Sequence, residues 1–172
     1  MIAPHRIKLP NGGEVHISSM WRARTIHKHY DWVVSLCDPA ADPGFRHEGV
    51  HHIYTVDDTE HPTEYDVLLT REEVEAFLSL RLSKGQKGLV HCHAGVSRST
   101  AVGSMIALKN GASLEDIRSG LDWSIADPNN LILGWSKTLL GVDLVTPMFG
   151  WWCDTHAEVD NGPYSSGQYS KY

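Results

Sequence analysis

Three short apolar runs constrain the fold of this chain more than any other feature. They read WVVSLC at 32–37, HHIYTV at 51–56 and GLVHC at 88–92. Each run is rich in β-branched or aromatic residues and has a length typical of a strand. We therefore predict three buried strands.

A helix is predicted between the second and third of these strands. Thr70 and Glu73 form a capping-box pattern, in which each side chain caps the backbone of the other residue. Apolar residues follow with helical spacing, so the helix should run from about 71 to 83 and end near Gly85. Because strand, helix and strand follow in this order, the expected fold class is α/β, with a central, mostly parallel twisted sheet flanked by helices.

Further elements are expected on either side of this unit. A turn at 11–13, with sequence Asn-Gly-Gly, supplies the positive φ angles of a hairpin, so EVHISS at 14–19 is expected to pair with HRIKLP at 5–10. The C-terminal half is predicted to be helical. A first helix is expected at 99–110, ending before Gly111. A second is expected to follow a cap formed by Ser113 and Asp116. A third is expected after Pro128-Asn129-Asn130, where Leu131 begins an apolar series.

The length of 172 residues, of which 41% are apolar, suits one domain with its own core. We assign residues 1–153 to this domain. From 154 to 172 the periodicity is lost and Gly, Ser, Asn and Tyr dominate, so this C-terminal tail is expected to be disordered. Just before the tail, Phe149, Trp151 and Trp152 are expected to pack on the core.

Charge and composition exclude several classes of partner. The formal net charge of −6 argues against binding of nucleic acid or of an anionic membrane, since both repel an acidic surface. The N-terminus lacks the apolar centre of a signal peptide, and no apolar run approaches the roughly 18 residues needed to span a bilayer. Cys37, Cys92 and Cys153 are widely spaced and odd in number, unlike a disulfide framework. We expect a soluble, cytoplasmic protein.

The segment VHCHAGVSRST at 90–100 joins the third predicted strand to the next helix. Cys92 ends the strand, and Arg98 and Ser99 open the helix. Such a loop turns backbone N–H groups inward at a helix N-terminus, where unpaired donors and the helix dipole favour an anion. Gly95 has no Cβ and permits the close turn. A phosphate-sized oxyanion is the expected occupant.

The same surroundings favour ionisation of Cys92. A free thiol has a pKa near 8.5, and a helix N-terminus with a nearby arginine can bring it to roughly 3.5–7.5. Cys92 is therefore predicted to be a thiolate nucleophile rather than a small buried apolar residue. Arg98 offers a planar fork that can hold two oxygens of an anionic group at once.

This segment resembles the signature loop of the cysteine-dependent protein tyrosine phosphatase superfamily: His-Cys, five residues, Arg, then Ser or Thr. GVSRS is similar to the dual-specificity subgroup, and WVVSLCD, HHIYTVDDT and the run 71–92 stand in the order of that subgroup. The resemblance covers about 15–142. It implies a dual-specificity-phosphatase-like fold and removal of phosphate from phosphotyrosine, and also from phosphoserine or phosphothreonine, in a protein or peptide. The reaction would pass through a cysteinyl-phosphate and need no cofactor.

The resemblance also implies an aspartic acid about thirty-odd residues before the cysteine. This acid protonates the leaving oxygen and later activates the water. Asp57 and Asp58 both lie in that range, in the segment VDDTEH. We favour Asp58, because in the subgroup the acid is usually the second residue of such a pair. Asp57 remains the alternative.

Other site residues follow from the same resemblance. Ser99 corresponds to the hydroxyl that bonds the departing thiolate, and it can also cap the following helix. His91 resembles the residue that fixes the loop geometry and supports the thiolate, whereas His93 is expected at the pocket rim. The expected substrate-binding residues are His93, Ala94, Gly95, Val96, Ser97 and Arg98.

Several alternatives remain open. The five residues between Cys92 and Arg98 are neutral or histidine, which favours a singly phosphorylated residue over a phosphoinositide. A phosphatase of RNA 5′-phosphates or lipid phosphates, a phosphoprotein-binding module and a sulfur transferase are the other candidate functions. Eleven histidines suggest a metal site, but no spacing matches a zinc pattern and a metal would consume the thiolate, so none is expected. Cys37 is either a core residue or a partner that forms a reversible disulfide with Cys92.

Overall fold

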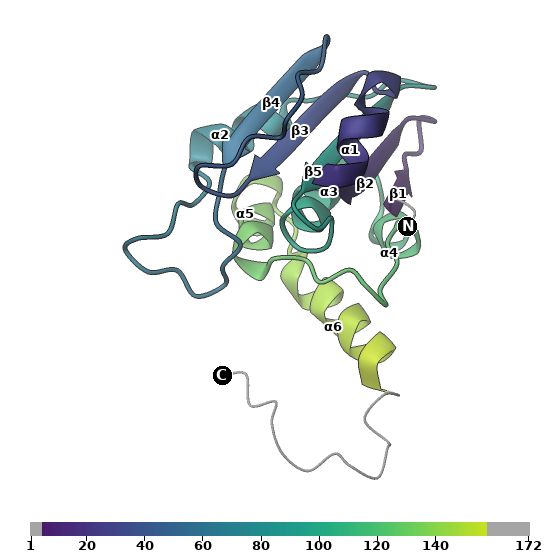
Figure 1. Cartoon of the computed structure of the whole chain (residues 1–172). Helices are drawn as coiled ribbons and strands as arrows, with labels where there is room; N and C mark the ends of the chain where they lie inside the picture. The colour runs from purple at the N-terminus through teal and green to yellow at the C-terminus, as the bar shows by residue number, and fades with distance from the viewer. Residues whose placement is uncertain (1–4, 158–172) are drawn as a thin grey trace.

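One mixed sheet forms the centre of the fold, drawn as arrows in Figure 1. The structure is a computed structural model that describes residues 5–157. The strands are β1 (His5–Lys8), β2 (Glu14–Ser19), β3 (Trp32–Cys37), β4 (Val50–Thr55) and β5 (Lys87–Cys92). They lie in the order β1-β2-β5-β3-β4, in which β1 is antiparallel to β2 and all other neighbours are parallel. The predicted α/β fold with a mostly parallel sheet is confirmed.

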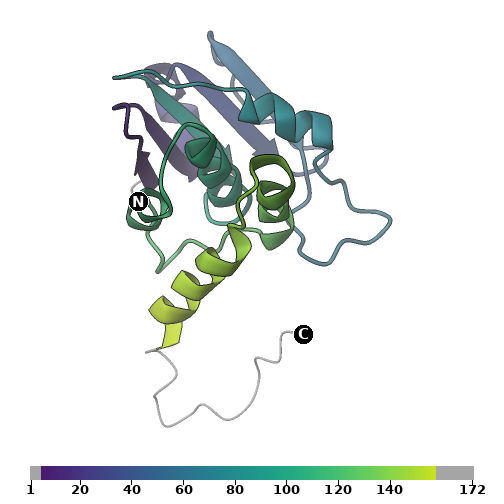
Figure 2. The same ribbon diagram turned by 180° about the vertical axis from the view of Figure 1, so that it is seen from behind.

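Helices cover both faces of the sheet. The first, α1 (Met20–Ile26), continues into a short 3₁₀ turn, η1 (His27–His29), and packs on one face (Figure 1). The opposite face is covered by α2 (Arg71–Leu78), α3 (Arg98–Lys109), α4 (Leu114–Gly120) and α5 (Asn130–Leu140) (Figure 2). The last helix, α6 (Val145–His156), packs against α5 and extends away from the sheet. Within residues 5–157, no helix is both long enough and apolar enough to cross a bilayer.

The two faces of the sheet bury separate apolar clusters. The larger cluster includes Ile17 of β2, Val90 of β5 and Ile106 of α3 and extends to the other C-terminal helices. The smaller cluster joins Ala23 of α1 to Val33 of β3 and to Leu89. Because β3 is paired on both sides and covered on both faces, all six of its residues are buried. This accounts for its continuous apolar sequence.

Local signals in the sequence correspond to real turns and caps. The β1–β2 hairpin turns through Gly12, whose φ is +84°. Thr70 caps α2 in a complete capping box with Glu73, and Ser113 forms the same arrangement with Asp116 at the start of α4. The predicted hairpin and both predicted caps are therefore confirmed.

The predicted helix at 71–83 is too long, because α2 ends at Leu78. The Ser79 hydroxyl donates to the carbonyl of Ala76 at 2.6 Å, which satisfies one of the last carbonyls of the helix. The following segment has no regular secondary structure, and the Asn110 side chain donates to the carbonyl of Leu80 and accepts from the N–H of Leu82. Both leucines are buried, so they belong to the core without belonging to the helix.

The end of the domain also differs from the prediction. Helix α6 runs to His156, so the predicted start of the disordered tail at 154 is wrong by at least three residues. Trp151 and Trp152 pack against the core as expected. Phe149, however, is 54% exposed, because the helix turns Met148, Trp151 and Trp152 inward and Phe149 outward. Residues 158–172 of the predicted tail lie outside the described residues.

Candidate active site

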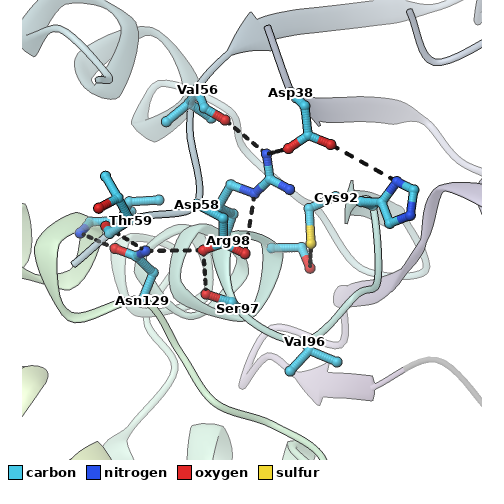
Figure 3. Close-up of polar contacts among 12 residues, drawn as sticks. Asp38, Val56, Asp58, Thr59, Cys92, Val96, Ser97, Arg98 and Asn129 are labelled. Carbon is cyan, nitrogen blue, oxygen red and sulfur yellow. Dashed lines mark hydrogen bonds and ion pairs between the residues drawn. The ribbon is translucent and has the colours of Figure 1, made fainter. Parts of the chain in front are cut away.

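Cys92 is the last residue of β5 and lies where the parallel strands end, at the start of the loop that leads to α3 (Figure 3). Its side chain is buried. The sulfur lies 3.3 Å from the backbone nitrogen of Gly95, which donates to it, and 3.2 Å from the hydroxyl oxygen of Ser99. A thiolate at this position would accept hydrogen bonds from both groups.

The loop 93–97, here called the phosphate loop, is held by bonds to its carbonyl groups. The carbonyl of His93 accepts from the backbone N–H of Met20 at 3.2 Å, and the carbonyl of Val96 accepts from that of Asp127, also at 3.2 Å. With these carbonyls bound to neighbouring elements, the N–H of Gly95 points to the sulfur. Backbone N–H groups at a helix N-terminus favour an anion.

Gly95 is the tightest point of the phosphate loop. Its φ is +80°, and a Cβ added there would lie 2.6 Å from the backbone of Ser18 and of Ser19 in β2. The imidazole of His5, which accepts a hydrogen bond from the Asp122 backbone at 3.1 Å, also bonds to the backbone of Gly95. Only glycine combines this φ with so close an approach, which is why the loop requires it.

Arg98 opens α3 and is 3% exposed. Its Nη1 donates to the carbonyl of Val56 at 2.8 Å and lies 2.7 Å from Oδ1 of Asp38 (Figure 3). Its Nε is buried and donates to no acceptor among the described residues, although Oδ2 of Asp58 lies 3.6 Å away. The edge of the guanidinium that carries Nε is therefore the edge with capacity to bind an oxyanion.

The two candidate acids face different surroundings. Oδ1 of Asp58 accepts a hydrogen bond of 2.6 Å from the hydroxyl of Ser97, within the phosphate loop. Asp57 instead pairs with Val67: its N–H donates to the Val67 carbonyl, and its Oδ2 accepts from the Val67 N–H, both at 2.8 Å. The structure thus brings Asp58 to the phosphate loop, whereas Asp57 closes the loop 57–67, here called the acid loop.

A cavity of about 310 Å³ lies between the acid loop and α5. Asp57 is among its lining residues and Asp58 is not, which agrees with the opposite directions of the two side chains. Most of the lining is apolar, and it comprises Val56, Asp57, Thr59, Leu68, Leu69, Leu131, Ile132, Gly134, Trp135 and Thr138.

Asn129 fixes the position of Asp58. Its Nδ2 donates to Oδ1 of Asp58 at 3.1 Å and to the carbonyl of Thr59 at 3.0 Å, while its Oδ1 accepts from the N–H of Ile132 and so caps α5 (Figure 3). The side chain is almost fully buried. Sequence reasoning missed this residue, and its signal was only the cap pattern after Pro128.

Asp38 was also missed by sequence reasoning. It directly follows β3, and the carboxyl ends of parallel strands meet at one edge of the sheet, so its position was the available signal. Besides Arg98, it approaches His93, whose Nδ1 lies 3.9 Å from Asp38 Oδ2. The His93 side chain is 76% exposed, at the rim of the phosphate loop, where the prediction placed it.

His91 lies beneath the phosphate loop and is fully buried. Its Nε2 is 2.6 Å from the hydroxyl oxygen of Ser35 in β3. Burial lowers the pKa of His91 to about 4, so the imidazole is neutral at pH 7. Within residues 5–157, no three histidine, cysteine or acidic side chains are grouped so as to hold a metal ion.

Cys37 and Cys92 lie on opposite faces of the sheet. Ser35 points to the same face as His91, to which it is hydrogen bonded. Because side chains alternate along a strand, Cys37 also points to that face and Cys92 points to the other. In agreement, Cys92 packs in the larger apolar cluster with Leu36. This arrangement does not support the alternative of a disulfide between Cys37 and Cys92, and in the structure both are free.

Two solved structures show the architecture of this chain. No family model and no curated protein matches this chain. The crystal structure of DUSP15 superimposes with a TM-score of 0.55 at 15% sequence identity and covers 84% of this chain and 95% of that protein. The PTP-2 phosphatase of Cydia pomonella gives a TM-score of 0.54 at 17% identity, with coverage of 80% and 90%.

The fold of this chain is therefore that of the cysteine-dependent phosphatases of the dual-specificity type, as the sequence predicted. Because the identities are low, this likeness concerns the fold.

Proposed function

We propose that this protein is a cysteine-dependent phosphomonoester hydrolase. One observation carries the proposal: the buried sulfur of Cys92 accepts a hydrogen bond of 3.3 Å from the Gly95 N–H of the phosphate loop, and the same loop is in contact with the acid and leads into Arg98. Asp58 accepts from Ser97 of this loop and lies 3.6 Å from Nε of Arg98. A nucleophile, an anion-binding edge and an acid at one strand end are the components that phosphoryl transfer to a thiolate requires.

In the first step the Cys92 thiolate attacks phosphorus while Nε of Arg98 and the loop N–H groups hold the equatorial oxygens. The bond from phosphorus to the leaving oxygen breaks, and Asp58 donates its proton to that oxygen. Because Oδ1 of Asp58 accepts from both Ser97 and Asn129, the proton belongs on Oδ2. Proton transfer from a placed acid contributes typically 10²–10⁴-fold to such steps.

In the second step a water molecule attacks the cysteinyl-phosphate. Asp58, now a carboxylate, accepts a proton from this water. The sulfur leaves as a thiolate, and the Ser99 hydroxyl at 3.2 Å and the Gly95 N–H stabilise the charge that develops on it. The products are inorganic phosphate and the starting enzyme.

We assign a phosphorylated protein or peptide as the substrate, with phosphotyrosine, phosphoserine or phosphothreonine as the phosphate-bearing residue. The phosphate loop contains no lysine or arginine before Arg98, which supports recognition of one phosphate rather than several. Three free cysteines support a reducing compartment, the cytoplasm, as the location.

The test is hydrolysis of p-nitrophenyl phosphate by the wild type, Cys92→Ser and Cys153→Ser, with and without EDTA. We expect Cys92→Ser to abolish turnover and Cys153→Ser, a change of a half-buried thiol on α6, to leave it unchanged. Phosphopeptides, a 5′-phosphorylated RNA and a phosphoinositide then compete for the same site. Turnover that survives Cys92→Ser would refute the thiolate mechanism, and preference for the RNA or lipid would refute the protein substrate.

A further inference from the structure

A chain of hydrogen bonds lies beneath the phosphate loop, on the α1 side of the sheet. The hydroxyl oxygen of Ser35 is at its centre, 2.6 Å from Nε2 of His91 and 2.8 Å from Nε2 of His51. The other nitrogen of His51, Nδ1, lies 3.1 Å from the backbone nitrogen of His47. The strands β3, β4 and β5 and the segment just before β4 therefore all contribute to one connected chain.

The direction of every hydrogen bond in this chain follows from its first member. The backbone N–H of His47 can only donate, so Nδ1 of His51 accepts and the proton of the neutral His51 ring is on Nε2. That proton is donated to the Ser35 oxygen. The Ser35 hydroxyl then donates to Nε2 of His91, which leaves the proton of the neutral His91 ring on Nδ1.

The free end of the chain is next to Cys92. Nδ1 of His91 is buried and makes no hydrogen bond of good geometry within the described residues. The backbone of Cys92 is nevertheless close enough to this imidazole to interact with it favourably. The N–H that the chain assigns to Nδ1 therefore lies beside the peptide group at the base of the phosphate loop.

Aromatic packing keeps the chain dry and its rings in place. Phe45 stacks on His51 with ring centroids 5.2 Å apart and on His27 at 4.3 Å, and its ring is tilted against His91 at 5.5 Å. The chain requires neutral rings. A protonated imidazole donates from both nitrogens, so His51 could not accept from the His47 N–H and His91 could not accept from the Ser35 hydroxyl.

The charged and titratable groups around the chain also favour its neutral form. Burial is the main reason that the pKa of His51, like that of His91, is lowered to about 4. The other groups that face the two rings add to this effect, and they are Arg24 of α1, Arg46 and His47 before β4, His27 of η1, and His52 of β4.

From this geometry we infer that Ser35 and His51 are positioning residues for Cys92. They act by holding His91 in the tautomer that is protonated on Nδ1. The inference rests on the proposed function, because it concerns the same thiolate. Without the Ser35 hydroxyl, His91 is free to carry its proton on Nε2, which places a lone pair instead of an N–H beside the Cys92 peptide group. The thiolate then loses the support of this N–H, and Cys92 reacts more slowly as a nucleophile.

The tautomer is tested directly by long-range ¹H–¹⁵N NMR of the ¹⁵N-histidine-labelled full chain. In the wild type we expect His91 to show a protonated Nδ1 and an unprotonated Nε2. Ser35→Thr, which keeps the hydroxyl, should retain this pattern, and Ser35→Ala should lose it. A wild-type spectrum with the proton on Nε2 would overturn the inference.

The consequence for Cys92 is measured by its rate of alkylation with iodoacetamide against pH, with the modified peptide identified by mass spectrometry. Ser35→Ala and His51→Phe are expected to lower the rate of alkylation at pH 6 several-fold, because the thiolate is the form that reacts. The second variant keeps a ring to stack on Phe45 and therefore serves where Ser35→Ala fails to fold. Unchanged alkylation profiles in both would contradict the inference.

Ser104→Ala provides a matched control. Ser104 is a fully buried serine of α3 whose hydroxyl has no hydrogen-bond partner among the described residues, so its loss should leave the alkylation profile unchanged. Neither measurement depends on substrate turnover. A wild type that hydrolyses no phosphomonoester but shows the expected tautomer and thiol titration would therefore refute the proposed function while leaving this arrangement intact.

Discussion

The hydroxyl of Ser97 donates a hydrogen bond of 2.6 Å to Oδ1 of Asp58, across 39 positions of the sequence. This bond joins the phosphate loop directly to the acid loop. It places the candidate acid beside the loop that would hold the phosphate. The same oxygen also accepts from Asn129, so one carboxylate oxygen is fully occupied and the other remains for proton transfer.

The roles of the two neighbouring aspartates can be separated by their amide variants. Asp58→Asn should lower kcat/KM, which reports the first step, by about 10²-fold or more for phenyl phosphate, because this leaving group needs a proton. It should lower kcat/KM much less for p-nitrophenyl phosphate, whose leaving group departs readily without one. Asp57→Asn retains an oxygen that can accept from the Val67 N–H and should change neither rate more than a few-fold. Equal losses for both leaving groups in Asp58→Asn would exclude it as the acid.

Asn129 should influence the reaction without contacting the substrate. Asn129→Ser keeps a residue that caps helices well, so the loss in unfolding free energy from the helix end should stay below about 1 kcal/mol. Serine is too short to reach Asp58, and kcat should fall about tenfold as the acid loses one of its two donors, with little change in KM. Parallel urea unfolding and kinetics measure both effects. A fall in stability with no fall in kcat would mean that Asn129 acts only as a cap.

Gly95 and Gly134 form a matched pair for substitution by alanine. At Gly95 the new Cβ would lie 2.6 Å from backbone atoms of β2 at a φ of +80°, and we expect a loss of unfolding free energy of about 2 kcal/mol or more together with loss of activity. At Gly134, inside α5, a Cβ meets nothing within 4 Å, so alanine should stabilise the protein by up to about 1 kcal/mol. Equal effects at the two positions would contradict this account of the phosphate loop.

The buried histidines make stability depend on pH in a defined window. The pKa of His91 is lowered to about 4 by burial, below the unfolded value near 6.5. Between these values the unfolded chain binds more protons than the folded one, so stability is complete above about pH 6.5 and is lost as the pH falls toward 4. The difference corresponds to about 3 kcal/mol for His91 alone.

Urea unfolding between pH 7.5 and pH 5 measures this loss of unfolding free energy. Carboxylates such as Glu14, whose pKa is lowered to about 2, contribute only at lower pH. His91→Gln should reduce the pH dependence and leave the part contributed by other histidines such as His51, whose pKa is also lowered to about 4. The replacement of an exposed histidine, His61→Gln, should leave it unchanged. A wild type equally stable at both pH values would show that His91 is not held as a buried neutral ring.

Local patterns in the sequence were sufficient for most of the fold. The run WVVSLC became β3 with the predicted bounds, because a strand covered on both faces is apolar along its whole length. The predicted length of α2 was wrong because Leu80 and Leu82 continue the apolar series of the helix. In the structure both are buried in the segment that follows the helix, where the Asn110 side chain binds their backbone groups.

The candidate site was predictable only where its residues are neighbours in sequence or match the resemblance. Cys92, Ser99 and Arg98 stand in one segment, and Asp58 follows a strand. Asp38 and Asn129 contact the site through the packing of distant elements, and no local pattern separates them from an ordinary loop aspartate or helix cap. The exposure of Phe149 was missed for a related reason: the apolar segment around it was not assigned a helical period.

The opposite facing of Cys37 and Cys92 determines what oxidation would do to this protein. Peroxide transfers an oxygen to a thiolate and gives a sulfenic acid, which a nearby second thiol can convert to a disulfide with loss of water. Because Cys37 points to the other face of the sheet, it is poorly placed to serve as that thiol while the sheet is intact. We expect a small external thiol such as glutathione to rescue Cys92 from further, irreversible oxidation, and the concentration of that thiol to set how quickly Cys92 is regenerated.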